Sequence, residues 1–416
     1  MSDRQPPNLD PALIRGLLQR RVSRRDVMRY AGIGAGALGM SAFLAACGVS
    51  GSSGGASSSP TVDVGAFWDK QSLHHVLNFA NWPYYIDTAK GSHPSLDLFT
   101  KKTEIKVNYK PAIQDNASFF ATLRPSLQAG KDTGWDLMVL TNGAQLTRLI
   151  EFGWLIPLDH DKLPNFAKYA SPSVKDPNYD PGNRYTLTWQ SGFTGIAVNT
   201  KYIKDHITSV QSLWNSAYKG KVGMMSDNTE LGSVGLLALG MDPATPDVAD
   251  WKKAAAKLQQ QRDAGLVRNY YDQSYINALQ NGDVWITQAW SGDIFQSQQS
   301  GYPELKFIVP DEGVMLWHDN MMIPAHAQNP LDALTYMDFV YQPKIAAMIA
   351  DWVWYITPVP DAKAIIANQL DDPAVAHSQL VFPSNATYQK AHDYYTFKNF
   401  QDEQQWNDIF QPIIEG

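Results

Sequence analysis

The chain has 416 residues, of which 44% are hydrophobic and 12% aromatic, and its formal net charge is −7. Residues 1–46 contain seven Arg and three Asp, so the rest of the chain has 27 basic and 38 acidic side chains and a net charge of −11. This balance argues against nucleic acid as a partner, because a nucleic-acid site needs clustered positive charge. It favours a cationic ligand only weakly, since many soluble proteins are equally acidic.

The first 46 residues have the pattern of a secretory signal. Residues 23–28 (SRRDVM) form a twin-arginine motif with Arg24 and Arg25, and an uncharged run follows over residues 31–47. A basic segment, a short apolar run and small residues at its end are typical of a signal that is removed. The alternative is a membrane anchor, but the run is Gly-rich and shorter than the ~20 apolar residues that a spanning helix needs. We therefore expect twin-arginine export, a route that carries proteins already folded.

Residues 44–47 (LAAC) resemble the lipobox of bacterial lipoproteins, in which the cysteine becomes the first mature residue and carries lipid. Cys47 is the only cysteine of the chain, so it has no disulfide partner within it. Residues 48–60 are rich in Gly and Ser, the composition of a flexible tether. We expect residues 47–61 to be a lipidated cysteine and tether that hold the protein at the outer face of the cell membrane.

Strand-like and helical patterns alternate after the tether. Strands are predicted at residues 74–80, 136–140, 193–199, 221–226, 284–290 and 305–310, and helices at residues 116–131, 143–153, 249–265 and 329–341. Such alternation predicts α/β lobes with largely parallel sheets, in which ligands bind beyond the carboxyl ends of the strands. The part from about Leu73 to Gly416 is too long for one compact core and suits two lobes.

No enzymatic motif is found in the part of the sequence predicted to fold. It contains no nucleophile elbow between a strand and a helix, no H-E-x-x-H, no P-loop and no G-x-G-x-x-G after a strand. His74 and His75 are adjacent, so in a strand they point to opposite faces and cannot hold one ion together. We therefore expect no catalytic residue, no cofactor and no metal. An exported enzyme stays an alternative, because twin-arginine export often carries proteins with cofactors.

Aromatic residues stand beside acids or turns at the ends of several predicted strands. Four such stretches are residues 81–87 with Trp82, residues 226–232 with Asp227 and Glu230, residues 287–295 with Trp290 and Asp293, and residues 316–320 with Trp317, His318 and Asp319. Each has a structural alternative: a tryptophan in the core, a helix-dipole complement at Glu230, or a turn at Asp319. Together they favour a receptor for an organic cation, in which each ring contributes about 0.5–2 kcal/mol and a carboxylate supplies the countercharge.

The order and spacing of these motifs resemble the bacterial spermidine/putrescine-binding proteins, the substrate-binding lipoproteins of polyamine ABC transporters. The resemblance covers most of the chain after the tether. It is carried by Asn81, Trp82 and Tyr85, residues 135–139, residues 195–199, residues 213–214 before residues 218–221, the strand that ends at Trp290, residues 317–319 before residues 323–325, and residues 355–358.

The resemblance implies a hinged, two-lobed fold of the periplasmic-binding-protein type (type II-like), which closes on a ligand in the cleft between the lobes. On this basis the first lobe comprises residues 73–190 and 318–341, and the second comprises residues 191–317 and 342–416. The chain is expected to cross between them near residues 190–192, 317–318 and 341–343.

The same resemblance implies roles for individual residues. Trp82 and Tyr85 line the site from the first lobe, Thr141 supplies a hydroxyl, Glu230 is the acid of the second lobe, Trp290 and Trp317 are flanking rings, and Asp319 holds an amino group. A shift of the alignment would favour Asn228 over Glu230, and the C-terminal contact has no clear counterpart among Tyr394, Tyr395 and Gln401.

Two positions depart from the best-known family members. Tyr84 stands where those members have an acid, and Gly143 stands where they have an aromatic ring. A diamine, or another cationic amine such as an opine-like or guanidino compound, therefore remains possible as the ligand, and Asp293 could replace the missing charge. The resemblance further implies a monomer that works with an ABC permease. The remaining alternative is a different small solute, but an anion would call for Arg or Lys at these strand ends.

Overall fold

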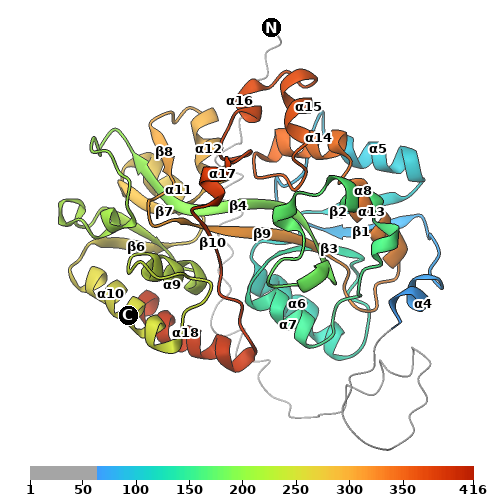
Figure 1. The fold of residues 1–416 in the computed structure, drawn as a ribbon, viewed down its shortest axis with the longest axis horizontal. Helices are drawn as coiled ribbons and strands as arrows, with labels where there is room; N and C mark the ends of the chain where they lie inside the picture. Colours follow the sequence, from blue (N-terminus) through green and yellow to red (C-terminus); the bar gives the residue numbers. More distant parts are fainter. Residues whose placement is uncertain (1–62) are drawn as a thin grey trace, which may run out of the picture. The chain divides into compact units, whose positions relative to one another are not determined.

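The computed structural model describes residues 63–416, which all lie in one compact unit. The predicted signal with Arg24 and Arg25, the predicted lipidation site Cys47 and the tether up to residue 61 lie outside the described residues. Among the helices of the described part, none combines the length and the apolar character needed to cross a membrane. Figure 1 shows how the helices and strands of this part are arranged.

The described strands form one continuous sheet in the order β2-β1-β3-β9-β4-β7-β5-β6, with β8 added to β4 and β10 added to β9. Their bounds are β1 (Val76–Ala80), β2 (Lys106–Lys110), β3 (Leu137–Thr141), β4 (Thr186–Asn199), β5 (Val222–Met225), β6 (Val267–Tyr271), β7 (Ile286–Trp290), β8 (Leu305–Ile308), β9 (Val314–Met322) and β10 (Ala391–Asp393). We call β1, β2, β3 and their helices the β1 side, and β5, β6, β7 and their helices the β5 side.

The sheet is mixed, which differs from the expectation of largely parallel sheets. Parallel pairs join β1 to β2 and β3, β5 to β6 and β7, and β10 to β9. The long strands β4 and β9 are antiparallel to each other, β9 is antiparallel to β3, and β4 is antiparallel to β7 and β8. The sequence could not show this difference, because buried strands of either direction read as short apolar runs.

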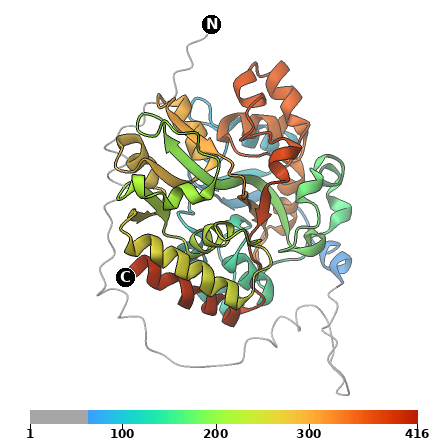
Figure 2. The ribbon, with the colours of Figure 1, turned by 60° about the vertical axis from the view of Figure 1, so that its left-hand side comes forward.

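Helices cover the faces of the sheet (Figures 1 and 2). They are α4 (Val64–Trp68), α5 (Pro94–Thr103), α6 (Asn116–Gln128), α7 (Ala144–Glu151), α8 (Pro164–Tyr169), α9 (Asn228–Leu237), α10 (Val248–Asp263), α11 (Tyr275–Asn281), α12 (Ser291–Gln299), α13 (Pro330–Phe339), α14 (Pro343–Val353), α15 (Ala362–Asn368), α16 (Pro373–Ala376), α17 (Asn385–Tyr388) and α18 (Phe400–Glu415). Helices α6 and α7 pack on the β1 side, while α18 packs against α9 and α10 on the β5 side.

The predicted helices are confirmed within a few residues, and local chemistry explains their ends. Helix α6 begins after Asp115, whose side chain accepts a hydrogen bond from the Ser118 N–H, and it contains Pro125 as the sequence indicated. Helix α7 is followed by Gly153, which adopts φ +65°, a conformation that suits glycine. Helix α13 begins with Pro330, at a position where the missing N–H costs nothing. The α/β fold class is thereby confirmed.

Strands β4 and β9 are the long elements that belong to both halves of the sheet. In their antiparallel pairing Gln190 lies opposite Asp319, Ser191 opposite His318, and Gly192 opposite Trp317. The register shifts between Thr188 and Gln190, which is a β-bulge or a similar irregularity. The two stretches expected to be the first crossings between lobes are therefore neighbours in one pair of strands.

The C-terminal segment, which the predicted division places in the second lobe, contacts both sides of the sheet. Helix α14 contacts α5 of the β1 side, and α15 packs on α14. At the end of α14, the Val353 carbonyl accepts a hydrogen bond from Gln296 on α12 of the β5 side. Further along the chain β10 pairs with β9, and α18 reaches α9 and α10. Amphipathic helices reveal which face is buried but not which neighbour covers it. The division into lobes stays a prediction.

Candidate functional site

The carboxylate of Asp319 lies in the middle of β9, whose nine residues are all buried. Tyr85 donates its hydroxyl hydrogen to Oδ2 of Asp319 at 2.7 Å, and Thr141 Oγ1 donates to Oδ1 at 2.7 Å. Two hydroxyl donors therefore offset part of the cost of burying this charge. This arrangement explains why an apolar strand can contain an aspartate.

The sheet itself places these three residues together. Thr141 is the last residue of β3 and lies directly opposite Asp319 in the antiparallel pair. Tyr85 follows β1, and its backbone carbonyl accepts a hydrogen bond from Trp189 Nε1 at 3.2 Å. Asn116 Nδ2 donates to Thr141 Oγ1 at 3.0 Å, which orients that hydroxyl toward Asp319. The carboxyl ends of β1 and β3 thus converge on one carboxylate.

Trp82 also lies beyond the end of β1, but it does not join this hydrogen-bonded group. Its indole Nε1 donates to the backbone carbonyl of Val139 at 3.1 Å, and the side chain is partly exposed. The structure therefore places Trp82 beside β3, at Val139, two residues before Thr141, and leaves the residue partly exposed.

A second buried carboxylate, Glu230, lies on the β5 side in the first turn of α9. Thr194 Oγ1 donates to Glu230 Oε1 at 2.8 Å, and Trp290 Nε1 donates to the same oxygen at 3.1 Å. The Tyr394 hydroxyl lies 3.3 Å from Thr194 Oγ1. The other oxygen, Glu230 Oε2, is buried and has no hydrogen-bond partner among the described residues. An unpartnered buried carboxylate oxygen is costly and marks a place where a donor could bind.

Burial shifts the titration of both acids upward. It raises the pKa of Asp319 from 3.8 to about 6, against hydrogen bonds from Tyr85 and Thr141 that lower it. It raises the pKa of Glu230 from 4.5 to about 7, and the nearby charge of Asp227 adds to this rise. Within residues 63–416 neither carboxylate forms an ion pair with a Lys or Arg. Each is therefore suited to gain a cationic partner.

A third buried acid, Asp293, lies in the first turn of α12 and was considered in the sequence only as a replacement charge. Tyr275 donates its hydroxyl hydrogen to Asp293 Oδ2 at 2.6 Å, and Tyr355 donates to Oδ1 at 3.1 Å. Burial raises the pKa of Asp293, and these hydrogen bonds oppose the rise. Tyr355 stands in one of the motifs that carry the resemblance, which is the signal that could have found it.

Tyr355 and Tyr275 connect the acids into one group. The Tyr355 ring lies 5.6 Å from the ring of Tyr85 and 5.3 Å from that of Trp317. The Tyr275 ring lies 6.1 Å from the ring of Trp290, and the Tyr275 hydroxyl accepts a hydrogen bond from the backbone N–H of Trp290. Six of the seven predicted ligand-binding residues therefore belong to one connected set of contacts: Tyr85, Thr141, Glu230, Trp290, Trp317 and Asp319. Trp82 flanks that set.

Trp317 lies flat against the backbone of β4. A Cβ atom added to Gly192 would come closer than 3.0 Å to three atoms of the indole ring, a separation that real Cβ atoms essentially never show. The indole Nε1 is buried and, among the described residues, has no hydrogen-bond partner. Glycine at position 192 is thus required for the position of this ring.

We expect Gly192→Ala to displace the Trp317 ring and to destabilise the protein by about 1–3 kcal/mol, the usual cost of overpacking. Urea unfolding of the chain from residue 61 measures the change in free energy. Gly65→Ala is the matched control, because a Cβ there meets an atom only at 3.5 Å. Equal stability of Gly192→Ala and wild type would show that the ring is free to move.

His318 is buried beside the site but points to a structural partner. Its Nδ1 lies 2.6 Å from Ser191 Oγ, and burial lowers the pKa of His318 from 6.5 to about 4. The imidazole is therefore neutral near pH 7. In the described part of the chain no three or more His, Cys, Asp or Glu side chains are grouped so that they could hold a metal ion.

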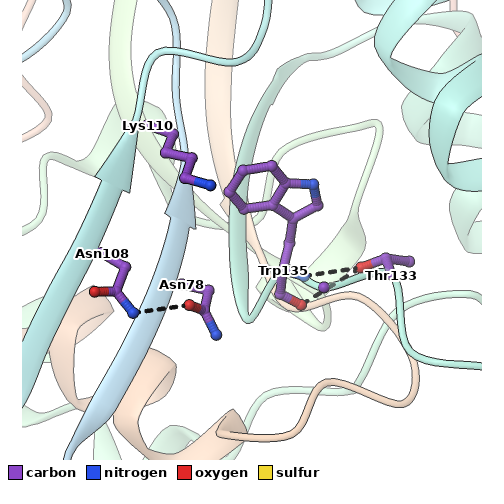
Figure 3. A pocket seen from close by; sticks show the side chains of 6 residues that line it. Asn78, Asn108, Lys110, Thr133 and Trp135 are labelled. Carbon is purple, nitrogen blue, oxygen red and sulfur yellow. Dashed lines mark hydrogen bonds between the residues drawn. The ribbon is translucent and has the colours of Figure 1, made fainter.

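A polar pocket of about 430 Å³ lies elsewhere, on the β1 side (Figure 3). Its lining residues are Asn78, Asn108, Lys110, Thr133, Gly134 and Trp135. The ammonium of Lys110 lies 5.9 Å from the Trp135 ring centroid, and Asn108 donates a hydrogen bond to Asn78. This lining has a positive charge and no carboxylate, so it does not suit an organic cation.

The chain is similar to known proteins over most of its length. Residues 95–377 match the family described as bacterial extracellular solute-binding protein. The chain is 31% identical over 310 residues to spermidine/putrescine-binding periplasmic protein 1 of Haemophilus influenzae, which covers 74% of this chain and 84% of that protein. It is 30% identical over 320 residues to the spermidine/putrescine-binding periplasmic protein of Salmonella typhimurium, which covers 77% of this chain and 86% of that protein.

A solved structure has the same fold. It is a spermidine/putrescine ABC transporter substrate-binding protein from Streptococcus pneumoniae, with a TM-score of 0.70 and 23% sequence identity. The match covers 81% of this chain and 98% of that one. The resemblance noted from the sequence motifs and the fold of the periplasmic-binding-protein type are both confirmed, while the hinge and the cleft stay predictions.

Proposed function

The chain belongs to the bacterial extracellular solute-binding protein family, and from this premise we propose that it binds a polyamine and delivers it to an ABC importer. The ligand class is a putrescine- or spermidine-like cation, as the names of the relatives from Haemophilus influenzae and Salmonella typhimurium say of those proteins. The relatives and this chain align over more than four fifths of the relatives' length.

The pairing of buried acids with aromatic rings is the observation that carries this proposal. Asp319 lies within β9, opposite Thr141 at the end of β3, and Glu230 lies in the first turn of α9 on the β5 side. Neither has a cationic partner within residues 63–416. A ligand with an amino group at each end would neutralise both carboxylates through charge-assisted hydrogen bonds. The rings of Trp290 and Trp317 would contribute cation–π attraction to the ammonium groups.

The proposed ligand-binding residues are those predicted from the sequence: Trp82, Tyr85, Thr141, Glu230, Trp290, Trp317 and Asp319. We add Asp293 and Tyr355, because they join the two halves of the group through hydrogen bonds and ring contacts. Asp293 supplies the third carboxylate and so supports ligands with more than two cationic groups. A Cβ atom added to Gly143 would meet no other atom within 4 Å. This open space supports a site that is less enclosed by aromatic rings near the start of α7.

The proposed mechanism is closure of two lobes around the ligand. The β1 side supplies Tyr85 and Thr141, the β5 side supplies Glu230 and Trp290, and β4 and β9 run between the sides. A ligand that contacts both sides binds the closed arrangement better than the open one and therefore shifts the population toward it. The permease would then recognise the closed form.

The proposed location follows from the N-terminal motifs, and the proposed permease partner follows from the family. We propose export through the twin-arginine signal with Arg24 and Arg25, then lipid attachment at Cys47, and an anchored monomer outside the cell membrane that works with an ABC permease. The protein carries out binding and transfer of the ligand to the importer, with no chemical conversion. The Gly/Ser-rich tether would let the binding unit move between free ligand and permease.

The test is a thermal-shift panel on the chain from residue 61, in which putrescine, cadaverine, spermidine, spermine and agmatine are compared with arginine. A ligand present at a hundred times its dissociation constant adds about 2.7 kcal/mol to the free energy of unfolding, which raises the melting temperature clearly. We expect a shift with one or two polyamines and none with arginine.

A shift with agmatine alone would indicate a guanidino ligand, and one with arginine alone would contradict the polyamine assignment. If no amine changes the melting temperature, the family fold is retained without an amine site. The cluster around Asp319 and Glu230 would then be a buried structural network.

A further inference from the structure

Outside the candidate site, one ion pair joins the two sides of the sheet. Arg148 on α7 donates a hydrogen bond from its guanidinium to Glu403 Oε1 on α18 at 2.8 Å. Helix α7 packs on β3 of the β1 side, whereas α18 packs on α9 and α10 of the β5 side. Figures 1 and 2 show the first turn of α18 beside α7. The pair therefore joins a helix of the β1 side to a helix of the β5 side.

The pair is set in a partly dry, aromatic environment. The side chain of Glu403 is 7% exposed and that of Arg148 is 21% exposed. The Arg148 guanidinium carbon lies 4.8 Å from the ring centroid of Phe400 on α18 and 5.8 Å from that of Phe120 on α6. A guanidinium between two rings has cation–π attraction in addition to its ion pair. Such a pair is stronger than an exposed one, which contributes little.

Each end of the pair is connected to the candidate site. Helix α7 begins three residues after Thr141, the hydroxyl donor to Asp319. Helix α18 holds the N-terminus of α9, on which Glu230 lies: Trp406 Nε1 donates to the Asn228 carbonyl at 3.0 Å. The Trp406 ring also packs so closely on Gly232 that a Cβ there would overlap it. Loss of contact between α7 and α18 would therefore loosen the approach of the Thr141 segment, which donates to Asp319, to the helix that carries Glu230.

We propose that the Arg148–Glu403 pair is a latch that favours the closed arrangement of the two sides and thereby makes Arg148 a positioning residue for ligand binding. The proposal rests on the proposed function, because it assumes a ligand held between the sides. The pair does not touch the proposed ligand-binding residues. It acts by raising the fraction of protein that is already competent to bind, which raises the apparent affinity by the same factor.

The first variant to test is Arg148→Ala in the chain from residue 61, whose residues 63–416 form one compact unit. We expect amine affinity to fall by about 3- to 10-fold, because the binding-competent fraction falls by that factor. Most of the loss should be in slower association, because fewer ligand-free molecules are competent to bind at any moment. Lys253→Ala is the matched control, since its ion pair with Asp250 lies within α10 alone.

A distance measurement separates the latch from the ligand assignment. The chain from residue 61 lacks Cys47, so Leu98→Cys on α5 and Leu239→Cys after α9 give two unique positions for spin labels. Without ligand, Arg148→Ala should lengthen the mean distance between the labels. The charge-reversed double variant Arg148→Glu with Glu403→Arg should shorten it again and recover affinity.

The outcomes are distinguishable from failure of the proposed function, because the distance in ligand-free protein needs no amine. Unchanged distances between the labels in Arg148→Ala would overturn the latch, even if this variant binds the amine more weakly. If Arg148→Ala does not fold, Glu403→Gln removes the same charge pair and is judged by the same two readouts.

Discussion

Asp319→Asn is expected to weaken amine binding about 100-fold at pH 8, because loss of one partner of a buried, hydrogen-bonded charge pair costs 2–5 kcal/mol. Asparagine has nearly the shape of aspartate, and its oxygen can still accept a hydrogen bond from one of the two hydroxyls of Tyr85 and Thr141. Its NH2 group can only donate, so the other hydroxyl must become the acceptor. What disappears is the negative charge that faces the ligand ammonium. Titration calorimetry with the best ligand of the thermal-shift panel measures the change in dissociation constant.

The same experiment compares the loss of affinity caused by removing the acid with the loss caused by removing an aromatic ring. Trp82→Ala removes one aromatic face, worth about 0.5–2 kcal/mol, so its effect should stay near or below tenfold. Asp338→Asn is the matched control for charge loss. Asp338 is also buried, but it accepts hydrogen bonds from Asn165 and Phe166 on α8. That variant should lose stability and keep its affinity. Equal affinity of Asp319→Asn and wild type would remove Asp319 from the site.

The second large effect is expected from pH. In the ligand-free protein the pKa is about 6 for Asp319 and about 7 for Glu230, both raised by burial. Each acid must lose its proton to pair with an ammonium, while an aliphatic amine stays protonated throughout this range. Affinity should therefore be nearly constant above pH 8 and fall as the pH decreases through 7 and 6. Between pH 8 and pH 5 the two protonations together predict a loss of roughly 100- to 1000-fold.

Proton release on binding provides an independent check of the direction in which affinity changes with pH. Near pH 6, binding should release between one and two protons, which calorimetry detects as a dependence of the apparent enthalpy on the ionisation heat of the buffer. His318 does not contribute, because its pKa of about 4 keeps it neutral over this range. An affinity that stays constant from pH 5 to pH 8 would show that neither carboxylate binds the amine directly.

Local sequence patterns were sufficient to find most of the strands but only a few of the helices. The apolar run before Thr141 became β3, and the Pro330 start and the Gly153 stop appear where helix chemistry places them. The long-range pairings could not be found in this way. Nothing in residues 314–322 indicates that they pair with β3 on one edge and β4 on the other, since both neighbours are distant in sequence.

The same limit applies to the candidate site. Trp290, Trp317 and Asp319 were recognisable because each follows or occupies an apolar run and stands beside another polar or aromatic residue. The hydrogen bond between Tyr355 and Asp293 could not be recognised in this way. Residues 293 and 355 are far apart in the chain, and their contact depends on the path of the segment after α14. Backbone hydrogen bonds between Ser191 and Ile356 fix that path. The side chains of these two residues give no sign of the pairing in the sequence.

The continuous sheet has a consequence for how the protein is made. Met138 of β3 pairs with Met322 of β9, and the whole β5 side is synthesised between them. The β1 side therefore cannot complete its sheet until nearly the entire chain has left the ribosome. Pairings between such distant residues fold slowly and leave strand edges exposed to aggregation. The proposed twin-arginine route, which carries folded proteins, would allow this slow step to be completed before export and before the proposed lipid attachment at Cys47.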